Sequence, residues 1–139
     1  MAVVSYEPGL GINRRTGQVM DGWAHVVQSL EVIFTTRFGE RVMREWFGSA
    51  VPYILGRNMI PETFIAYFSA ICGAIELWEP RFRITQIVPL EVDRLGRARF
   101  RIEGTHYPRG HLGDMTPAGT RRIVAYGGSG ADWTVREAA

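Results

Sequence analysis

The spacing of apolar residues changes at Pro80, from a helical period before it to a strand period after it. Over residues 61–78 apolar side chains recur at helical spacing, which predicts an amphipathic helix. Over 82–88 they alternate, imperfectly, with other side chains, which is typical of a strand. Because proline disfavours helical geometry at the preceding residue and fixes its own φ, the helix must end at Glu79 and the chain must leave through a rigid corner.

The other patterns predict a single α+β domain. Asp21 is suited to cap a further helix over 22–36, where apolar residues again form one stripe. The segment 97–103 alternates outward arginines with inward apolar residues and is the clearest strand, while 121–126 resembles another. We expect the two main helices to pack on a small antiparallel sheet built from 82–126, with one sheet face rich in arginine.

Turn-forming residues divide the chain into three segments. Residues 1–20 carry several turn signals and are predicted to form an N-terminal arm. The α+β domain is expected over 21–126, with a short helix at 52–55 and a hairpin turn at 93–96. Residues 127–139 begin with Gly-Gly-Ser-Gly, a composition typical of linkers, and are predicted to form a flexible C-terminal tail.

Composition places the chain among ordinary globular proteins. It has 139 residues, of which 46% are hydrophobic, enough for a core without disulfides. No apolar run reaches the roughly 18 residues of a membrane helix, and Met1 to Tyr6 lacks the pattern of a secretory signal. The lone Cys72 has no partner for an internal disulfide, which fits synthesis in a reducing cytoplasm.

The basic residues are all arginine, although the formal net charge is only +2. Codon bias toward GC-rich codons would produce this pattern, and so would selection for interfaces, because the planar guanidinium pairs carboxylates bidentately. Acidic residues are interleaved with the arginines, whereas nucleic-acid binding needs a concentrated basic face. We therefore expect neither nucleic acid nor membrane as a partner.

The sequence offers little that is typical of catalysis. His106 and His111 share one loop with Asp114, but no further histidine or cysteine stands at metal-ligand spacing. Glu76 and Glu79 are neighbours on a helix face and are the nearest approach to the paired carboxylates of a glycosidase. No nucleophile elbow or phosphate-binding loop is present. We predict no catalytic residue, no metal and no cofactor.

The two charges beside Pro80 have two interpretations. A corner made rigid by proline would present Glu79 and Arg81 to a neighbouring chain with little entropy left to lose. On this interpretation Arg81→Ala leaves the isolated monomer folded but blocks assembly. Alternatively, each side chain satisfies a helix end or a strand arginine within the monomer.

Trp133 also has two interpretations, because it lies beyond the predicted linker. A partner surface would bury it, since tryptophan is enriched at protein interfaces. Alternatively, the tail folds back onto its own domain and buries the ring there.

Several stretches resemble the contractile-tail baseplate wedge family, the sheath initiators of bacteriophages, and they follow the family's order and spacing. Type VI secretion baseplates have a related component. The matching stretches are residues 11–17 (GINRRTG), 23–36, 41–49 (RVMREWFGS) and Glu79-Pro80-Arg81, the last resembling the family's Glu-Pro-Arg signature. Asn13 stands where aspartate is common in the family, and Trp46-Phe47 where Glu-Tyr is common. The resemblance covers about residues 10–103.

This resemblance implies a structural protein of a tail baseplate, assembled in the cytoplasm of a bacterial host and carried in the virion. In the family the Glu-Pro-Arg corner contacts a helical core bundle of other wedge proteins. A strand platform, for which we favour 97–103 and 120–126, is extended by the first ring of tail sheath subunits through β-augmentation. The family's sixfold symmetry implies about six copies, with tail tube or hub proteins as further candidate partners.

Together, the corner, the arginine-rich face and the tail provide the candidate partner-binding residues. They are Glu79, Pro80, Arg81, Arg83, Arg99, Arg101, Arg121, Arg122 and Trp133. The alternative functions are a peptidoglycan hydrolase, because relatives in this family have carried a lysozyme label, and a nucleic-acid-binding module.

Overall fold

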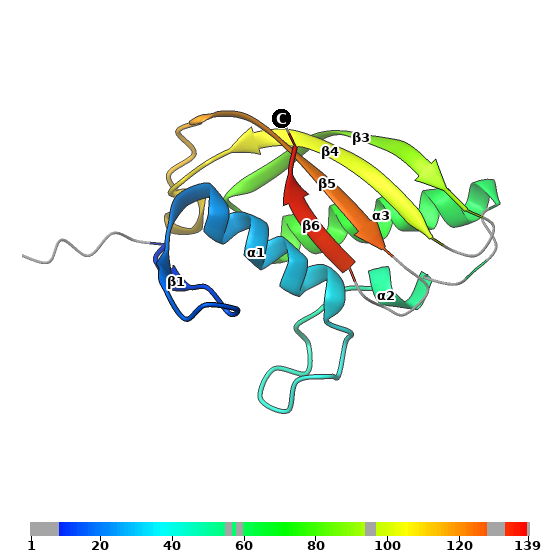
Figure 1. Ribbon diagram of the computed structural model, residues 1–139, viewed down its shortest axis with the longest axis horizontal. Helices are drawn as coiled ribbons and strands as arrows, with labels where there is room; N and C mark the ends of the chain where they lie inside the picture. Colours follow the sequence, from blue (N-terminus) through cyan, green and yellow to red (C-terminus); the bar gives the residue numbers. More distant parts are fainter. Residues whose placement is uncertain (1–8, 55–56, 58–59, 94–96, 128–132, 139) are drawn as a thin grey trace, which may run out of the picture.

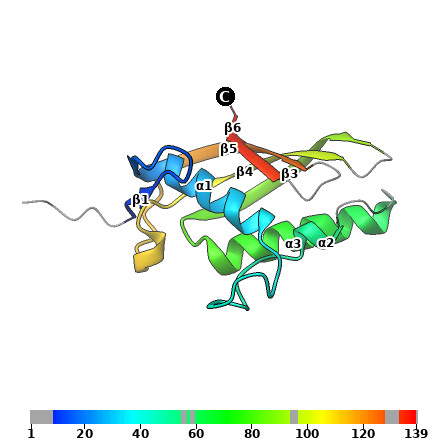
Figure 2. The ribbon, with the colours of Figure 1, turned by 60° about the horizontal axis from the view of Figure 1, so that its bottom comes forward.

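The computed structural model of the protein describes residues 9–54, 57, 60–93, 97–127 and 133–138. Its two long helices lie on one face of a four-stranded antiparallel sheet, and no described helix covers the opposite face (Figure 1, Figure 2). In chain order the elements are β1 (Gly11–Ile12), β2 (Val19–Met20), α1 (Gly22–Thr35), α2 (Val51–Ile54), α3 (Pro61–Trp78), β3 (Phe82–Val92), β4 (Ala98–His106), a 3-10 turn (Gly110–Leu112), β5 (Gly119–Gly127) and β6 (Trp133–Glu137).

The two main helices form where the periodicity predicts them. Pro61 occupies the first turn of α3 with acidic Glu62 beside it, which suits the positive end of the helix dipole. The helix ends at Glu79, whose backbone N–H still donates to the Ile75 carbonyl at 2.9 Å. In α1 the expected N-cap is wrong in one respect: Asp21 is at the N-cap position, but its side chain makes no capping hydrogen bond.

The sheet has the order β3-β4-β5-β6, with antiparallel neighbours throughout. Alternation along β4 is as predicted: Ala98, Phe100 and Ile102 are buried toward the helices, and the arginines between them face outward. The predicted turn at 93–96 falls mostly outside the described residues, as does residue 55 of the predicted short helix.

The C-terminal segment corrects the predicted architecture. Where a flexible tail was expected over 127–139, residues 133–137 form β6, which pairs with β5 from Ile123↔Glu137 to Gly127↔Trp133. Residues 128–132, which include most of the predicted linker, lie outside the described residues. This segment forms a strand because its alternate residues Trp133 and Val135 are buried and complete the core beneath the sheet edge.

An aromatic cluster forms the centre of the core. The Trp133 ring is 5.9 Å from Phe34 of α1, 6.3 Å from Tyr67 of α3 and 6.4 Å from Phe100 of β4, measured between ring centroids. All four side chains are buried. One residue from each of four elements thus ties both helices to the sheet.

The described part of the N-terminal arm is docked on α1. The Gln28 side-chain amide donates to the Ile12 carbonyl at 2.9 Å and accepts from the Arg14 backbone N–H at 3.0 Å. The buried Glu31 carboxylate pairs with Arg14 at 2.6 Å and with Arg15 at 3.3 Å. The GINRRTG motif therefore serves, in part, to hold the β1–β2 hairpin against the first helix. No described helix has the length and apolarity needed to cross a membrane.

Candidate partner-binding surfaces

The corner at Pro80 closes on itself. Arg81 Nε lies 2.7 Å from Glu79 Oε1 and Arg81 Nη2 lies 2.9 Å from Glu79 Oε2, a bidentate pair. Glu79 is 2% exposed and Arg81 is 8% exposed. The expectation that these two side chains face outward is therefore wrong; Pro80 between them is the exposed residue.

Segments distant in sequence enclose this pair. Arg81 Nη1 lies 3.0 Å from His25 Nδ1 of α1. The Arg81 carbonyl accepts the Tyr107 backbone N–H at 2.7 Å, and Gly110 packs so closely on the Pro80 carbonyl that a β-carbon at 110 would collide with it. Proximity across the proline thus allows the pair to form, and the packing of α1 and residues 107–110 removes it from solvent.

His106 extends this buried cluster. Its ring is 5.1 Å from the Trp23 ring, and neither ring nitrogen has a hydrogen-bond partner among the described residues. Burial lowers the pKa of His106 below its ordinary value of 6.5, and the positive charges of Arg121 and Arg81 lower this pKa further. Glu79 acts in the opposite direction. The folded protein therefore favours the neutral imidazole.

This environment predicts a loss of stability at mildly acidic pH. Because the pKa of His106 is lower in the folded state, the unfolded chain takes up the proton first as pH falls. Stability is retained above the unfolded-state pKa and is lost as pH decreases toward the folded-state value. We expect the melting temperature to fall between about pH 7 and pH 5, and His106→Phe to reduce that fall.

Thermal melts of the wild type, His106→Phe and His111→Phe across this pH range provide the measurement. His111 is exposed and serves as the matched control, which should keep the wild-type pH dependence. An unchanged slope in His106→Phe would exclude the assignment to this residue.

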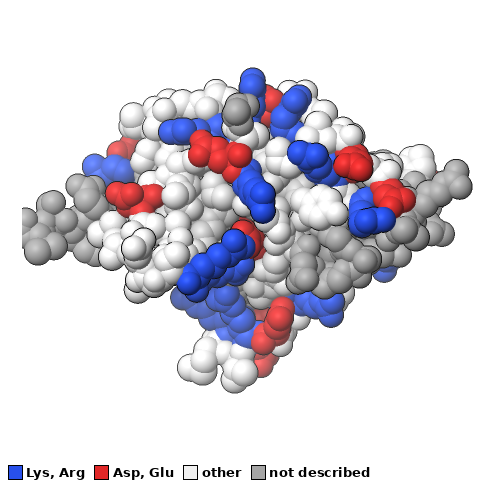
Figure 3. Space-filling model, viewed as in Figure 1, with Lys and Arg blue, Asp and Glu red and all other residues white. Residues whose placement is uncertain are grey.

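The predicted arginine-rich face is the helix-free side of the sheet. Arg99, Arg101 and Arg122 face outward there, and Figure 3 shows basic and acidic side chains interleaved over the upper part of the molecule. Glu103 lies between Arg101 at 3.2 Å and Arg122 at 3.1 Å. One carboxylate is thus shared by two of the three outward arginines.

Arg83 and Arg121 differ from this group. Arg83 is exposed, with its guanidinium 6.0 Å from the Tyr107 ring centre. Arg121 lies over the Trp23 ring at 5.7 Å and pairs with Glu137 at 3.3 Å, on the opposite sheet face from Arg122. The structure thus separates Arg121 from the outward arginines with which it was grouped. Trp133 is buried in the core, so the chain itself supplies the surface that covers it.

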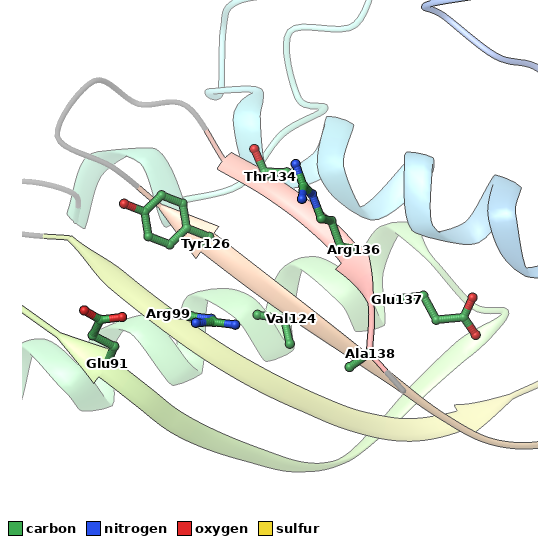
Figure 4. A pocket seen from close by; sticks show the side chains of 8 residues that line it. All are labelled: Glu91, Arg99, Val124, Tyr126, Thr134, Arg136, Glu137 and Ala138. Carbon is green, nitrogen blue, oxygen red and sulfur yellow. The ribbon is translucent and has the colours of Figure 1, made fainter.

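A shallow hollow of about 650 Å³ occupies the outer sheet face near β6 (Figure 4). All four strands of the sheet contribute to its lining, which consists of Glu91, Arg99, Val124, Tyr126, Thr134, Arg136, Glu137 and Ala138. Arg99 and Arg136 make no ion pair with any residue that the structure describes. Arg136 was missed by sequence reasoning, although the alternation in 133–137 would have indicated a strand.

The sheet also decides where a further strand can be added. β4 pairs with β3 and β5, and β5 pairs with β4 and β6, so both are internal. The favoured region, 97–103 and 120–126, therefore lies inside the sheet and has no free edge of its own. The sequence alone does not identify the edge strand. The edges of this sheet are β3 and β6.

Comparison with known proteins gives a consistent assignment. The family model of baseplate wedge protein gp25 matches residues 21–109, more than half of the chain. Baseplate protein W of Escherichia phage P2 is 29% identical over 107 residues, covering 77% of this chain and 92% of that protein.

Solved structures match as well. A chain of the postcontracted pyocin R2 baseplate superposes with a TM-score of 0.62 at 29% identity, over 70% of this chain and 97% of that one. A putative tail lysozyme from Geobacter sulfurreducens superposes with a TM-score of 0.61, over 79% of this chain and 94% of that one, but at 22% identity it shows the fold alone. The chain therefore belongs to the baseplate wedge protein gp25 family and is a structural protein of a phage-type tail baseplate.

Proposed function

We propose that this subunit joins the baseplate to the first sheath ring and initiates sheath assembly by accepting a sheath strand at the free edge of β6. Membership in the baseplate wedge family supports the setting. The observation that carries the proposal is the difference between the two sheet edges, since strand addition requires a row of unpaired backbone groups.

The β3 edge carries features that discourage strand addition. Pro89 lies within β3 and has no N–H to donate, and register shifts interrupt its pairing with β4 at Ile84/Gln86 and at Pro89/Glu91. Bulges and proline are common means by which proteins protect an exposed edge strand. β6 contains no proline, and its described pairing with β5 runs without a shift.

The hydrogen-bond pattern identifies the groups that β6 would offer. The Ala138 backbone N–H donates to the Arg122 carbonyl of β5 at 2.9 Å. Because donors alternate along an antiparallel pair, the N–H groups of Trp133, Val135 and Glu137 point away from β5. An added strand would pair with these three residues.

The adjoining hollow supports an acidic partner segment. Arg136 of β6 and Arg99 of β4 line it and make no ion pair with a described residue, although Glu91 and Glu137 also line the hollow. A sheath strand added beside β6 would bring its side chains alongside this outer face, where a carboxylate would find a guanidinium. Such charge complementarity orients a partner and accelerates association.

The proposal retains the wider set of partners as expectations. Helical wedge proteins would meet the exposed Pro80 side of the corner, because Glu79 and Arg81 are buried and paired with each other. Tail tube or hub proteins and about six copies per particle remain predictions. No step in this function requires catalysis.

The two carboxylates that suggested a hydrolase, Glu76 and Glu79, are not arranged as a catalytic pair. Glu79 is held bidentately by Arg81, whereas Glu76 is exposed on α3. Glycoside hydrolysis requires two carboxyl groups free to act on one bond. Zymography on peptidoglycan distinguishes this alternative from a structural role.

The substitution Glu137→Pro tests strand addition at β6. It removes an N–H that points away from β5, so the isolated protein should lose only about 1 kcal/mol or less. We expect baseplates that contain this variant to nucleate far fewer extended sheaths, as counted by electron microscopy. Glu137→Ala is the matched control: it removes the exposed ion pair with Arg121 but keeps the N–H. If baseplates that contain the Glu137→Pro variant nucleate as many extended sheaths as wild-type baseplates, β6 is not the edge that accepts the sheath strand.

A further inference from the structure

The segment between α1 and α2 projects from the body of the molecule as a loop, residues 37–48 (Figure 1, Figure 2). It contains most of the RVMREWFGS motif, whose role neither the sheet nor the corner explains. Four large apolar side chains of this loop are exposed to solvent: Val42 is 89% exposed, Met43 88%, Trp46 66% and Phe38 45%. An exposed cluster of this size is typical of an interaction site.

The base of the loop is held in place. The Gly39 backbone N–H donates to the Glu45 carbonyl at 2.7 Å, and the Ser49 N–H donates to the Thr36 carbonyl at 3.0 Å. Trp78 of α3 donates its indole N–H to the Gly48 carbonyl at 2.9 Å. The exposed apolar tip is therefore displayed on a braced loop, which reduces the entropy lost on binding.

Gly48 reinforces this bracing. Its φ of +144° disfavours other residues, and a β-carbon there would meet the backbone of Arg37 at 2.8 Å. The two sides of the loop thus approach more closely than a side chain at this position would permit.

A small apolar groove lies beside the loop. Its volume is about 170 Å³, suited to one apolar side chain, and it runs between Phe38 of the loop and the C-terminal part of α3. Leu77 and Trp78 form one wall, and Ala70, Gly73 and Ala74 also line the groove. The Tyr53 hydroxyl of α2 donates to the Phe38 carbonyl at 3.3 Å, which ties the loop to α2.

The loop carries three arginines against two glutamates, Glu40 and Glu45. The arginines at 37, 41 and 44 are exposed and make no ion pair with a described residue, although Arg41 stacks on the Phe47 ring at 4.5 Å. The Glu40 carboxylate accepts the backbone N–H of Arg37 at 2.8 Å. A partner that supplied carboxylates would therefore find several guanidinium groups available around the apolar tip.

We propose that the 37–48 loop and its groove form a docking site for a segment of another baseplate protein, one that inserts an apolar side chain into the groove and pairs acidic residues with the loop arginines. A second copy of this chain fits less well, because an isologous contact would place arginine against arginine. The proposal rests on the family assignment but not on strand addition at β6, so the two can fail separately.

Photocrosslinking in assembled tail particles tests the contact directly. The probe is p-benzoylphenylalanine in place of Trp46, with the same probe in place of Ile65 as control, since Ile65 on α3 is 65% exposed and lies outside the loop. We expect the probe at 46 to attach to a different baseplate protein, at a peptide that contains Asp or Glu. No adduct, attachment to the chain's own copies or to lipid, or the same adduct from both positions would overturn the proposal.

A second measurement separates binding from folding. Combined Val42→Ser, Met43→Ser and Trp46→Ser should reduce incorporation into particles by about tenfold or more, because aromatic anchors dominate interface affinity. The melting temperature of the isolated chain should stay close to that of the wild type, and Ile65→Ser should assemble normally. Wild-type incorporation would overturn the proposal. So would a large fall in melting temperature, because it would mean that these side chains stabilise their own chain.

Discussion

Replacing Arg81 by alanine is expected to destabilise the isolated protein by about 3–5 kcal/mol, since it leaves the Glu79 carboxylate buried without its partner. Both ends of the pair are nearly inaccessible, and the carboxylate now receives two hydrogen bonds from the guanidinium. Chemical denaturation followed by circular dichroism measures the loss. This expectation replaces the one drawn from sequence, in which the variant stays folded and fails only in assembly.

Arg83→Ala is the matched control for this experiment. Arg83 is exposed at the start of β3, with its guanidinium 6.0 Å from the Tyr107 ring centre, so its loss should change stability by about 0.5 kcal/mol or less. Replacing Glu79 by glutamine should also be costly, because the buried guanidinium then loses its counter-charge. An Arg81→Ala protein as stable as the Arg83→Ala protein would contradict the buried pair and restore the outward-facing corner.

Replacing Trp133 by alanine is expected to cost about 3–5 kcal/mol, because the indole is buried among aromatic rings from both helices and the sheet. Its near-parallel stacking on Phe100, at 13° between planes, and its contact with Phe34 would both be lost. We also expect β6 to detach from β5, since Trp133 is one of its two buried anchors. Urea denaturation gives the stability, and hydrogen exchange of the β5 amides reports the detachment.

Trp46→Ala controls for the loss of a tryptophan as such. The Trp46 ring is exposed on the 37–48 loop, so its removal should change stability by about 0.5 kcal/mol or less. If the Trp133→Ala and Trp46→Ala variants are equally stable in urea, Trp133 does not contribute to the core and the C-terminal segment does not fold back onto the domain.

The elements that local patterns predict best are those with long, regular periods. α3 and β4 follow from periods of 3.6 and 2, and Pro80 places the break between helix and sheet within a residue or two. β6 was missed because its five residues follow a glycine-rich stretch and too few positions alternate to outweigh that composition. Only the core that Trp133 completes makes this strand stable.

The candidate site residues also fall into two groups: those that local alternation places and those that only the order of strands in the sheet places. Alternation along β4 correctly placed Arg99 and Arg101 on the outer face, because strand side chains alternate without reference to the rest of the fold. It did not place Arg136 beside them, since cross-strand neighbours depend on sheet order. Nor did it show that 97–103 lies between two other strands and has no free edge.

By itself, the sequence determined that a helix stops at Pro80 and that a strand follows, because backbone sterics and side-chain periodicity act over a few residues. Whether Glu79 and Arg81 turn toward solvent or toward each other was decided by the tertiary structure. The reason is solvation: α1 and the segment 107–110 exclude water from the corner, and a carboxylate and a guanidinium deprived of water are held by one another.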